Sequence, residues 1–201
     1  MNRGRLLALE GLDGCGKSTQ VEPLAEALRG AGHDVLTTCE PTDGPHGRRI
    51  REMARSGESV APEEELRWFV EDRREHVAQL LEPALAAGRV VLTDRYYLSS
   101  VAYQGARGLD WGAILADSER EFPAPDLALL FEIDPAAGLA RVRARGGAID
   151  RGFEHPEVLA RVAEIFRALE RPYVERIDAA GSAEAVSRAV RERVRERLAL
   201  L

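Results

Sequence analysis

Short apolar runs alternate with longer amphipathic segments along this chain. The runs are 6–10, 34–38, 90–93, 127–133 and, more weakly, 174–178, and segments with helical periodicity separate them. Because a parallel strand is buried on both faces, its sequence is nearly continuously apolar. The pattern predicts an α/β fold of three layers, a parallel five-stranded sheet between helices, with ligands at the carboxyl ends of the strands. The most loop-like stretches are 40–47, 105–112 and 146–155, and we expect them to carry function.

The first apolar run leads into a glycine-rich loop that matches the phosphate-binding pattern G-x-x-x-x-G-K-[ST], the P-loop. Its glycines permit positive φ, so successive backbone N–H groups can surround an anion, and a helix beginning at Lys17 adds its positive end. Ser18 supplies a hydroxyl suited to Mg²⁺ beside the phosphates. A chance glycine turn is disfavoured because a strand precedes the loop and helical periodicity follows it. We expect a nucleotide's phosphates at Gly11, Leu12, Asp13, Gly14, Cys15, Gly16, Lys17, Ser18 and Thr19.

Composition narrows the class of protein. Lys17 is the only lysine among the 28 basic residues, so the one compact ammonium of the chain lies in the P-loop. The net charge of −6 argues against nucleic acid or an anionic membrane surface as a partner. No apolar run approaches the roughly 18 residues of a membrane span, and Cys15 and Cys39 form no metal-binding motif. We expect a single domain over residues 1–201, located in the cytoplasm.

A predicted helix over 62–87 contains one basic residue on its apolar face. Arg73 interrupts a stripe made of Leu66, Phe69, Val70, Val77, Leu80, Leu81 and Ala84. Phe69 lies one turn earlier, so an aromatic ring and a guanidinium can project side by side and hold a planar base. The alternative is a structural Arg73 paired with Glu or Asp, and the sequence leaves both interpretations open.

The third apolar run ends in Asp94-Arg95-Tyr96, followed by the segment Ser99 to Gly105. A carboxylate directly after a buried strand is placed to hold metal-bound water beside a P-loop. We therefore expect Ser18 and Asp94 at the metal. Arg95 can clamp a phosphate through two parallel N–H bonds.

Taken in order, these motifs resemble those of thymidylate kinases, a family of P-loop nucleoside monophosphate kinases. The resemblance rests on the following segments: Gly11-Leu12-Asp13, Glu40-Pro41, Gly47 with Ile50-Arg51, Phe69 with Arg73, Asp94-Arg95-Tyr96, Ser99 to Gly105, and an Arg-rich lid beginning at Arg141. It implies transfer of the γ-phosphoryl group of ATP to dTMP, giving dTDP, with Mg²⁺ as cofactor and a homodimeric assembly. It also implies that dTMP contacts Asp13, Pro41, Phe69, Arg73, Arg95, Ser99, Ser100, Tyr103 and Gln104.

Catalysis in this family needs positive charge beyond the P-loop. Lys17, Asp94 and Arg95 would act in the transfer. Some thymidylate kinases carry Arg at the position of Gly14, so this chain must supply a catalytic arginine from elsewhere. We expect it in a lid over approximately 141–155, with Arg143 and Arg145 on ATP and Arg145 as the catalytic residue. Cys39 and the stretch 42–45 depart from the family pattern, which leaves strict dTMP selectivity less secure than phosphoryl transfer.

Three alternatives stay open at this stage. The nearest is a kinase of broader deoxynucleoside monophosphate specificity. A GTP-dependent switch would need a lysine-containing guanine motif, and the chain has no second lysine with which to form one. The third is a P-loop module that binds a nucleotide without turning it over, which would not require Asp94, Arg95 and the Phe69–Arg73 pair at a second site.

Overall fold

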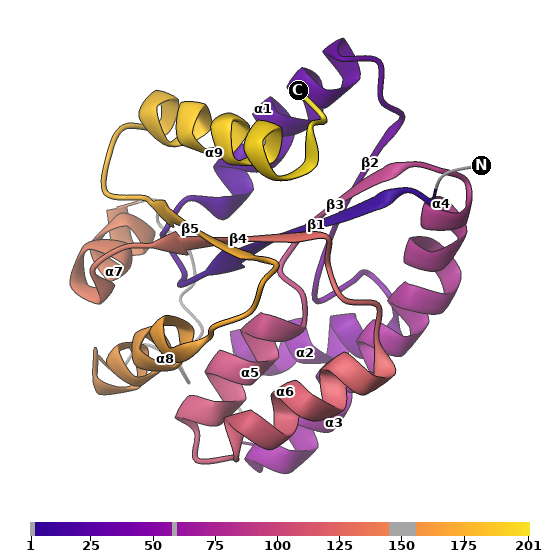
Figure 1. Ribbon diagram of the computed structural model, residues 1–201. Helices are drawn as coiled ribbons and strands as arrows, with labels where there is room; N and C mark the ends of the chain where they lie inside the picture. Colours follow the sequence, from indigo (N-terminus) through magenta and orange to yellow (C-terminus); the bar gives the residue numbers. More distant parts are fainter. Residues whose placement is uncertain (1–2, 58–59, 145–155) are drawn as a thin grey trace.

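A parallel five-stranded sheet forms the centre of the protein. The computed structural model describes residues 3–57, 60–144 and 156–201. The strands are β1 (Arg5–Gly11), β2 (Val35–Cys39), β3 (Val90–Asp94), β4 (Leu127–Glu132) and β5 (Val174–Asp178). They lie in the order β2-β3-β1-β4-β5, and every pairing is parallel (Figure 1). The predicted α/β fold with a parallel five-stranded sheet is thus confirmed, with strand limits within two residues of those expected.

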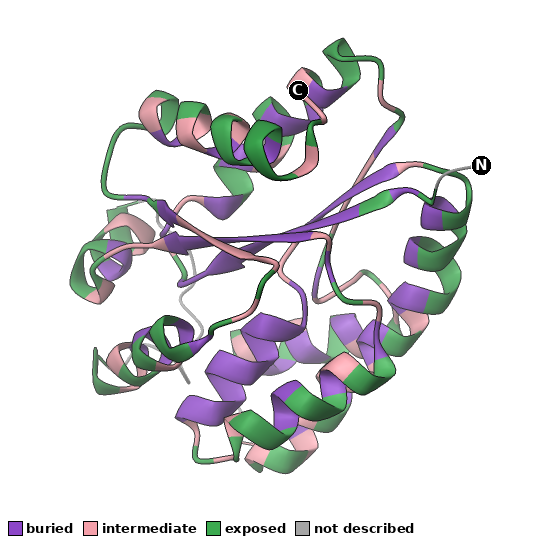
Figure 2. Cartoon of the chain, in the orientation of Figure 1, coloured by how far each residue is buried: buried purple, intermediate pink, exposed green. Residues whose placement is uncertain are grey.

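Helices cover both faces of the sheet. α1 (Lys17–Gly30) and α9 (Ala183–Leu198) pack together on one face, and α5 (Tyr97–Ala106), α6 (Trp111–Glu121) and α8 (Pro156–Ala168) lie on the other (Figure 1). Neighbouring strand residues point in opposite directions, so Leu6 and Ala8 join the core beneath α5 while Leu7 and Leu9 join the core beneath α1. Burial on both faces explains why the central strands β1, β3 and β4 read as continuous apolar runs (Figure 2).

The predicted helix over 62–87 has three parts. α3 (Pro62–His76) continues into a π-helical turn, η1 (Val77–Leu81), and then α4 (Glu82–Ala86). A π turn holds more residues than an α turn and therefore shifts the phase of every later side chain. The expected apolar stripe is confirmed at every position except Leu80, since its other members are buried or pack against a core cluster: Leu66, Phe69, Val70, Val77, Leu81 and Ala84. Leu80 is 37% exposed, whereas the buried side chains of α3 are mainly polar: Glu65, Trp68, Asp72, Arg73 and His76.

Two of the three expected loops are shorter than predicted. α2 (Pro45–Ser56) begins inside the stretch 40–47, because Pro45 suits the first turn of a helix. Gly105 belongs to α5 and Gly112 to α6, whose N-terminal cap Asp110 accepts a hydrogen bond from the Ala113 N–H at 3.1 Å. The stretch 146–155 lies outside the described residues. α7 (Pro135–Ala144) follows β4 at the carboxyl edge of the sheet (Figure 1).

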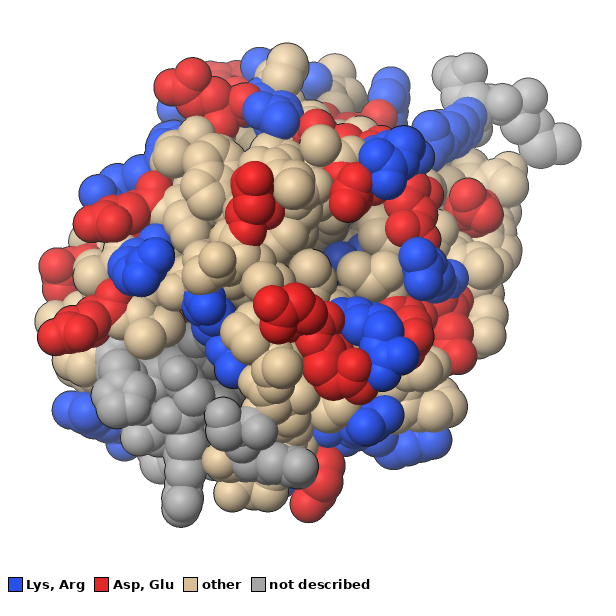
Figure 3. Space-filling model, turned by 90° about the horizontal axis from the view of Figure 1, so that it is seen from below, with Lys and Arg blue, Asp and Glu red and all other residues tan. Residues whose placement is uncertain are grey.

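Among the described residues, charged side chains of both signs are interspersed on the face covered by the lower helices of Figure 1, and they form no large patch of either sign (Figure 3). Within the ranges that the structure describes, none of the helices combines the length and the apolar character needed to cross a bilayer.

Candidate active site

The P-loop connects β1 to α1 and takes the backbone conformation that its glycines allow. Gly11, Gly14 and Gly16 have φ values of 140°, 79° and 98°. Lys17, the first residue of α1, is 5% exposed, and its ammonium donates to the carbonyls of Gly11 and Leu12 at 2.9 and 2.8 Å. The loop therefore wraps around the ammonium of Lys17 at the N-terminus of α1. The positive charge and the helix N-terminus together favour an anion at this point.

Oxygen ligands for a divalent cation lie beside the loop. The hydroxyl of Ser18 donates to Asp94 Oδ2, which brings the first turn of α1 against the end of β3. The other oxygen, Asp94 Oδ1, is buried and has no hydrogen-bond partner among the described residues. A carboxylate oxygen that lacks a donor, next to a hydroxyl, fits Mg²⁺, which prefers oxygen ligands. The two residues expected at the metal are thus neighbours.

A cleft runs from the P-loop to α2, and we call it the P-loop cleft. Its volume is about 510 Å³. Of the residues that the structure describes, four basic ones line it: Lys17, Arg51, Arg55 and Arg95. The lining also includes the carboxylates of Asp13, Glu40 and Asp94. Because cations from three different elements converge on one cleft, it suits a ligand with several negative charges.

Arg95 is held in an unusual conformation between the cleft and α5. Its φ is 72°, in the left-handed region that side chains rarely adopt. The guanidinium donates to Asp13 Oδ1 at 2.5 Å and to Ser99 Oγ at 2.9 Å, and it lies 5.1 Å from the centre of the Tyr103 ring. Burial opposes ionisation of the Asp13 carboxyl, but the nearby charges of Arg95 and Lys17 outweigh it and lower its pKa. Arg95 thus stays charged and fixed at the junction of two cavities.

The second cavity, which we call the inner pocket, has a volume of about 200 Å³. Its lining includes all but one of the residues that the resemblance assigns to dTMP: Asp13, Pro41, Phe69, Arg95, Ser99, Ser100, Tyr103 and Gln104. It shares Asp13, Pro41, Arg51, Ala54 and Arg95 with the P-loop cleft, so the two cavities are continuous. Residues widely separated in the sequence therefore build one bipartite site.

Arg73 lies behind the inner pocket and is 1% exposed. Its guanidinium contacts Glu40 Oε2 at 2.7 and 2.9 Å and donates to Ser100 Oγ at 3.0 Å. One nitrogen, Nη1, is buried without a partner among the described residues, and so is Gln104 Oε1. The structural interpretation of Arg73 is therefore confirmed by its ion pair with Glu40, and its contact with a base stays a prediction that the unused donor permits.

A third hollow, of about 400 Å³, lies on the other side of the P-loop between α7 and α9. Its lining includes Thr19, Arg141 and Gly181. Arg141 is anchored there, because its guanidinium donates to the carbonyls of Ala179 and Ala180 at 2.9 and 3.2 Å. Arg143 is exposed on α7 and does not line this hollow, and Arg145 lies outside the described residues.

Gly14 has a packing role. A Cβ at this position would lie 2.1 Å from the carbonyl oxygen of Gly138 in α7. The P-loop and α7 are therefore in backbone contact, and an arginine could not occupy position 14 without displacing α7. Leu12 also serves the fold, since its side chain is 4% exposed.

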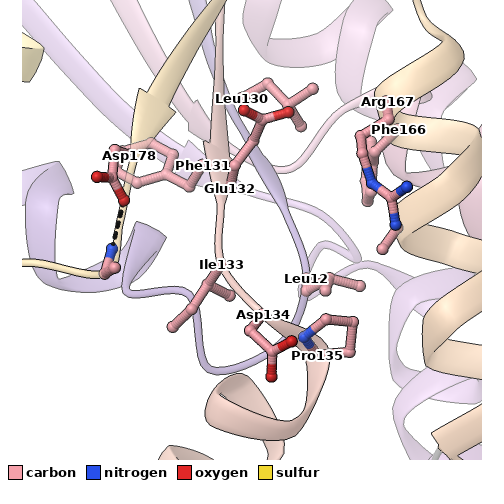
Figure 4. Close-up of a pocket in the computed structure, with 12 residues that line it drawn as sticks. Leu12, Leu130, Phe131, Glu132, Ile133, Asp134, Pro135, Phe166, Arg167 and Asp178 are labelled. Atoms are coloured by element: carbon pink, nitrogen blue, oxygen red, sulfur yellow. Dashed lines mark hydrogen bonds between the residues drawn. The ribbon is translucent and has the colours of Figure 1, made fainter.

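The Leu12 side chain points into a separate cavity of about 410 Å³ between β4, α7 and α8 (Figure 4). The carboxylates around it have partners within the protein: Glu132 pairs with Arg176, Asp134 accepts from the N–H of Ala136, and Asp178 accepts from the N–H of Ala180. This cavity shares no lining residue with the P-loop cleft, and we assign it no part in the site.

Sequence reasoning missed several residues of the site. Glu40, Ile50 and Arg51 were noted only as parts of motifs, and Ala54 and Arg55 were not considered, although each lines a cavity of the site. The available signal was the spacing of Arg51 and Arg55, which places both on one side of a helix. It could not show that α2 turns that side toward the P-loop.

Comparison with known proteins agrees with this geometry. The family model described as thymidylate kinase matches residues 9–190. A thymidylate kinase from Desulfotalea psychrophila is 45% identical over 98% of this chain and 97% of its own length. A thymidylate kinase from Xanthomonas campestris is 46% identical over 92% of this chain and 80% of its own length. One from Xylella fastidiosa is 45% identical over 91% of this chain and 83% of its own length. The chain therefore belongs to the thymidylate kinase family.

Proposed function

We propose that this protein transfers the γ-phosphoryl group of ATP to dTMP, giving dTDP and ADP. The observation that carries the proposal is the bipartite site, in which a cleft rich in positive charge opens into a small pocket of suitable size for a pyrimidine nucleoside. A nucleotide acceptor would place its base in the inner pocket and its 5′-phosphate near Arg95 and Arg51. The donor's phosphates would then lie on the P-loop, at the opposite side of the same cleft.

Gln104 in the inner pocket and Arg73 behind it would together select the base. Thymine has an acceptor at O4 and a donor at N3, which match the unused donor Arg73 Nη1 and the unused acceptor Gln104 Oε1. Cytosine has a donor at N4 and an acceptor at N3, which is the opposite arrangement. It would leave two buried polar groups unsatisfied, a mismatch that sites built to hydrogen-bond their substrate reject strongly. Phe69, half-buried at the pocket wall, would stack on the ring.

Uracil has the same polar edge as thymine and lacks only the methyl group. A single methyl group in an apolar pocket contributes about 1–3 kcal/mol. We therefore expect dUMP to be a weak substrate and dCMP a very poor one. This distinction separates a thymidylate kinase from a kinase of broader specificity.

The chemistry needs positioning and charge, and it does not need a general base. The second pKa of a phosphate monoester is about 6, so the attacking oxygen of dTMP is already anionic at neutral pH. Lys17 would contact the donor phosphates and Arg95 the acceptor phosphate, which brings two anions together for transfer in line. Ser18 and Asp94 would hold Mg²⁺, which supplies further positive charge to the donor phosphates when bound.

The donor's nucleoside would occupy the hollow between α7 and α9, next to Thr19 and Arg141. We retain the proposal that a lid over approximately 141–155 closes on ATP and that Arg145 is its catalytic arginine. Arg143 would contact ATP from the same lid. As the family resemblance implies, we also propose a cytoplasmic homodimer in which residues 1–201 form one kinase domain.

An acceptor panel tests this function. ADP formation from ATP would be measured with dTMP, dUMP, dCMP and dGMP, each with and without Mg²⁺. We expect Mg²⁺-dependent turnover with dTMP, a lower kcat/KM with dUMP by about tenfold to a hundredfold, and almost none with dCMP. Equal turnover of all four acceptors would support the broader-specificity alternative. ADP formation independent of any acceptor would refute the proposal.

A further inference from the structure

One buried carboxylate beside the P-loop has no part in the mechanism above. Glu10 is the residue before Gly11 in β1, and its exposed fraction is 0%. Strand alternation places it on the same face as Leu6 and Ala8, toward α5. A buried carboxylate is costly unless it is hydrogen-bonded, so Glu10 needs partners within the protein.

The two oxygens of Glu10 bind groups on either side of Arg95. Oε1 accepts a hydrogen bond from the backbone N–H of Tyr96 at 2.9 Å. Oε2 accepts from the hydroxyl of Ser99 at 2.5 Å. Tyr96 follows Arg95 in the chain, and the Ser99 oxygen in turn accepts from Arg95 Nη1 at 2.9 Å. Glu10 therefore contacts the peptide that leaves Arg95 and, through one hydroxyl, its guanidinium.

The backbone of Arg95 needs such support, because its φ of 72° is unfavourable for a side chain of this size. Two further contacts hold the same residue: the Arg95 N–H donates to the Leu9 carbonyl at 2.9 Å, and the Thr93 hydroxyl donates to the Arg95 carbonyl at 2.7 Å. Glu10 adds the only one of these contacts that also reaches the guanidinium.

We infer that Glu10 is a positioning residue for the acceptor phosphate, which it serves by fixing both the backbone and the guanidinium of Arg95. This role rests on the proposed function, in which Arg95 binds the phosphate of dTMP. It explains why a carboxylate, Glu10, directly follows the four apolar residues from Leu6 to Leu9 in the same strand.

The negative charge matters as well as the shape. In Glu10→Gln the Tyr96 N–H still needs an acceptor, so the amide oxygen must face it and the amide NH₂ must face Ser99. The hydroxyl of Ser99 can then no longer donate to residue 10. Without a carboxylate as its acceptor, the Ser99 oxygen becomes a weaker acceptor for the hydrogen bond from Arg95. The substitution changes the orientation of Arg95 without leaving a cavity.

The test compares two ligands that differ only in the phosphate. Calorimetric binding constants for dTMP and thymidine would be measured at pH 8 with the wild-type protein, Glu10→Gln and Ser99→Ala. The ratio of the two constants reports the phosphate contribution. We expect each substitution to lower this ratio by about tenfold, as for the loss of one oriented charge-assisted hydrogen bond. The double variant should show no further loss, because both residues act on Arg95 in one chain of contacts.

The matched control is Glu65→Gln, another buried glutamate, which is 1% exposed, pairs with Arg107 and lines neither cavity of the site. Its ratio should equal that of the wild type. Equal losses for dTMP and thymidine in Glu10→Gln would show a merely structural role and overturn the inference, as would additive effects in the double variant. If Glu10→Gln does not fold, Ser99→Ala alone decides, and an unchanged ratio would then overturn it. Wild-type protein that binds dTMP no better than thymidine would contradict the proposed function itself.

Discussion

The pH dependence of stability should reveal the burial of Glu10. Desolvation raises the pKa of its carboxyl from an ordinary 4.5 to about 7, even though the hydrogen bond from Ser99 and the charges of Arg95, Lys17 and Arg73 lower it. Between these two pH values the folded protein therefore holds a proton that the unfolded chain has released. The free energy of unfolding must then fall as the pH rises through this interval.

The size of the effect follows from the two pKa values. Each tenfold change in proton affinity is worth about 1.4 kcal/mol, so the wild-type protein should lose roughly 3 kcal/mol between pH 4.5 and pH 8 from this group alone. In Glu10→Gln the group is neutral at every pH and the loss disappears. Because the other titrating groups are common to both proteins, their contributions largely cancel in the difference between the two.

Urea unfolding followed by the fluorescence of Trp68 and Trp111 measures this difference. We expect the unfolding free energy of Glu10→Gln minus that of the wild type to rise by about 3 kcal/mol from pH 4.5 to pH 8, with equal m-values. A difference that stays constant over this range would refute the reasoning, because it would show that burial does not perturb Glu10.

Three further predictions concern the P-loop and the metal. Gly14→Ala should destabilise the protein by about 1–3 kcal/mol more than Gly16→Ala. Both glycines have positive φ, but only a Cβ at position 14 would meet α7, at the carbonyl of Gly138. Thermal unfolding of the two variants checks this prediction, and equal losses of stability would contradict it. Asp94→Asn should raise the Mg²⁺ concentration for half-maximal activity by about tenfold or more, as a Mg²⁺ titration of the rate would show, and an unchanged midpoint would remove Asp94 from the metal site. Lys17→Met should lower kcat by about a hundredfold or more with little change in dTMP affinity, and a large loss of dTMP affinity would place Lys17 on the acceptor side.

Local patterns were sufficient to predict the sheet and the P-loop. The central strands β1, β3 and β4 are buried on both faces, so their apolar runs are visible without knowledge of their neighbours, and the P-loop is contiguous in the sequence. Arg73 was identifiable because a charge on an apolar face stands out. Its partner Glu40 was not, since the two residues meet only after α3 packs against the end of β2.

The remaining features depend on tertiary contacts. The π turn at Val77–Leu81 has no clear sequence signal and shifts the register of the helix that was predicted to run without interruption. Glu10 follows Leu9 in an apolar strand and gave no indication that its carboxylate would lie beneath α5, 89 positions from its partner Ser99. Likewise, the roles of Arg51 and Arg55 depend on how α2 is oriented toward the P-loop. Such residues become visible only when distant segments are brought together.

The central claim is that one bipartite site joins ATP to dTMP. Phosphorus NMR of the purified protein with ATP, dTMP and Mg²⁺ tests it directly, because the spectrum separates dTDP and ADP from the starting nucleotides and from free phosphate. The account predicts that dTDP and ADP appear in equal amounts and that neither appears when dTMP is omitted. Release of inorganic phosphate without dTDP, or no dTMP-dependent loss of ATP, would contradict it.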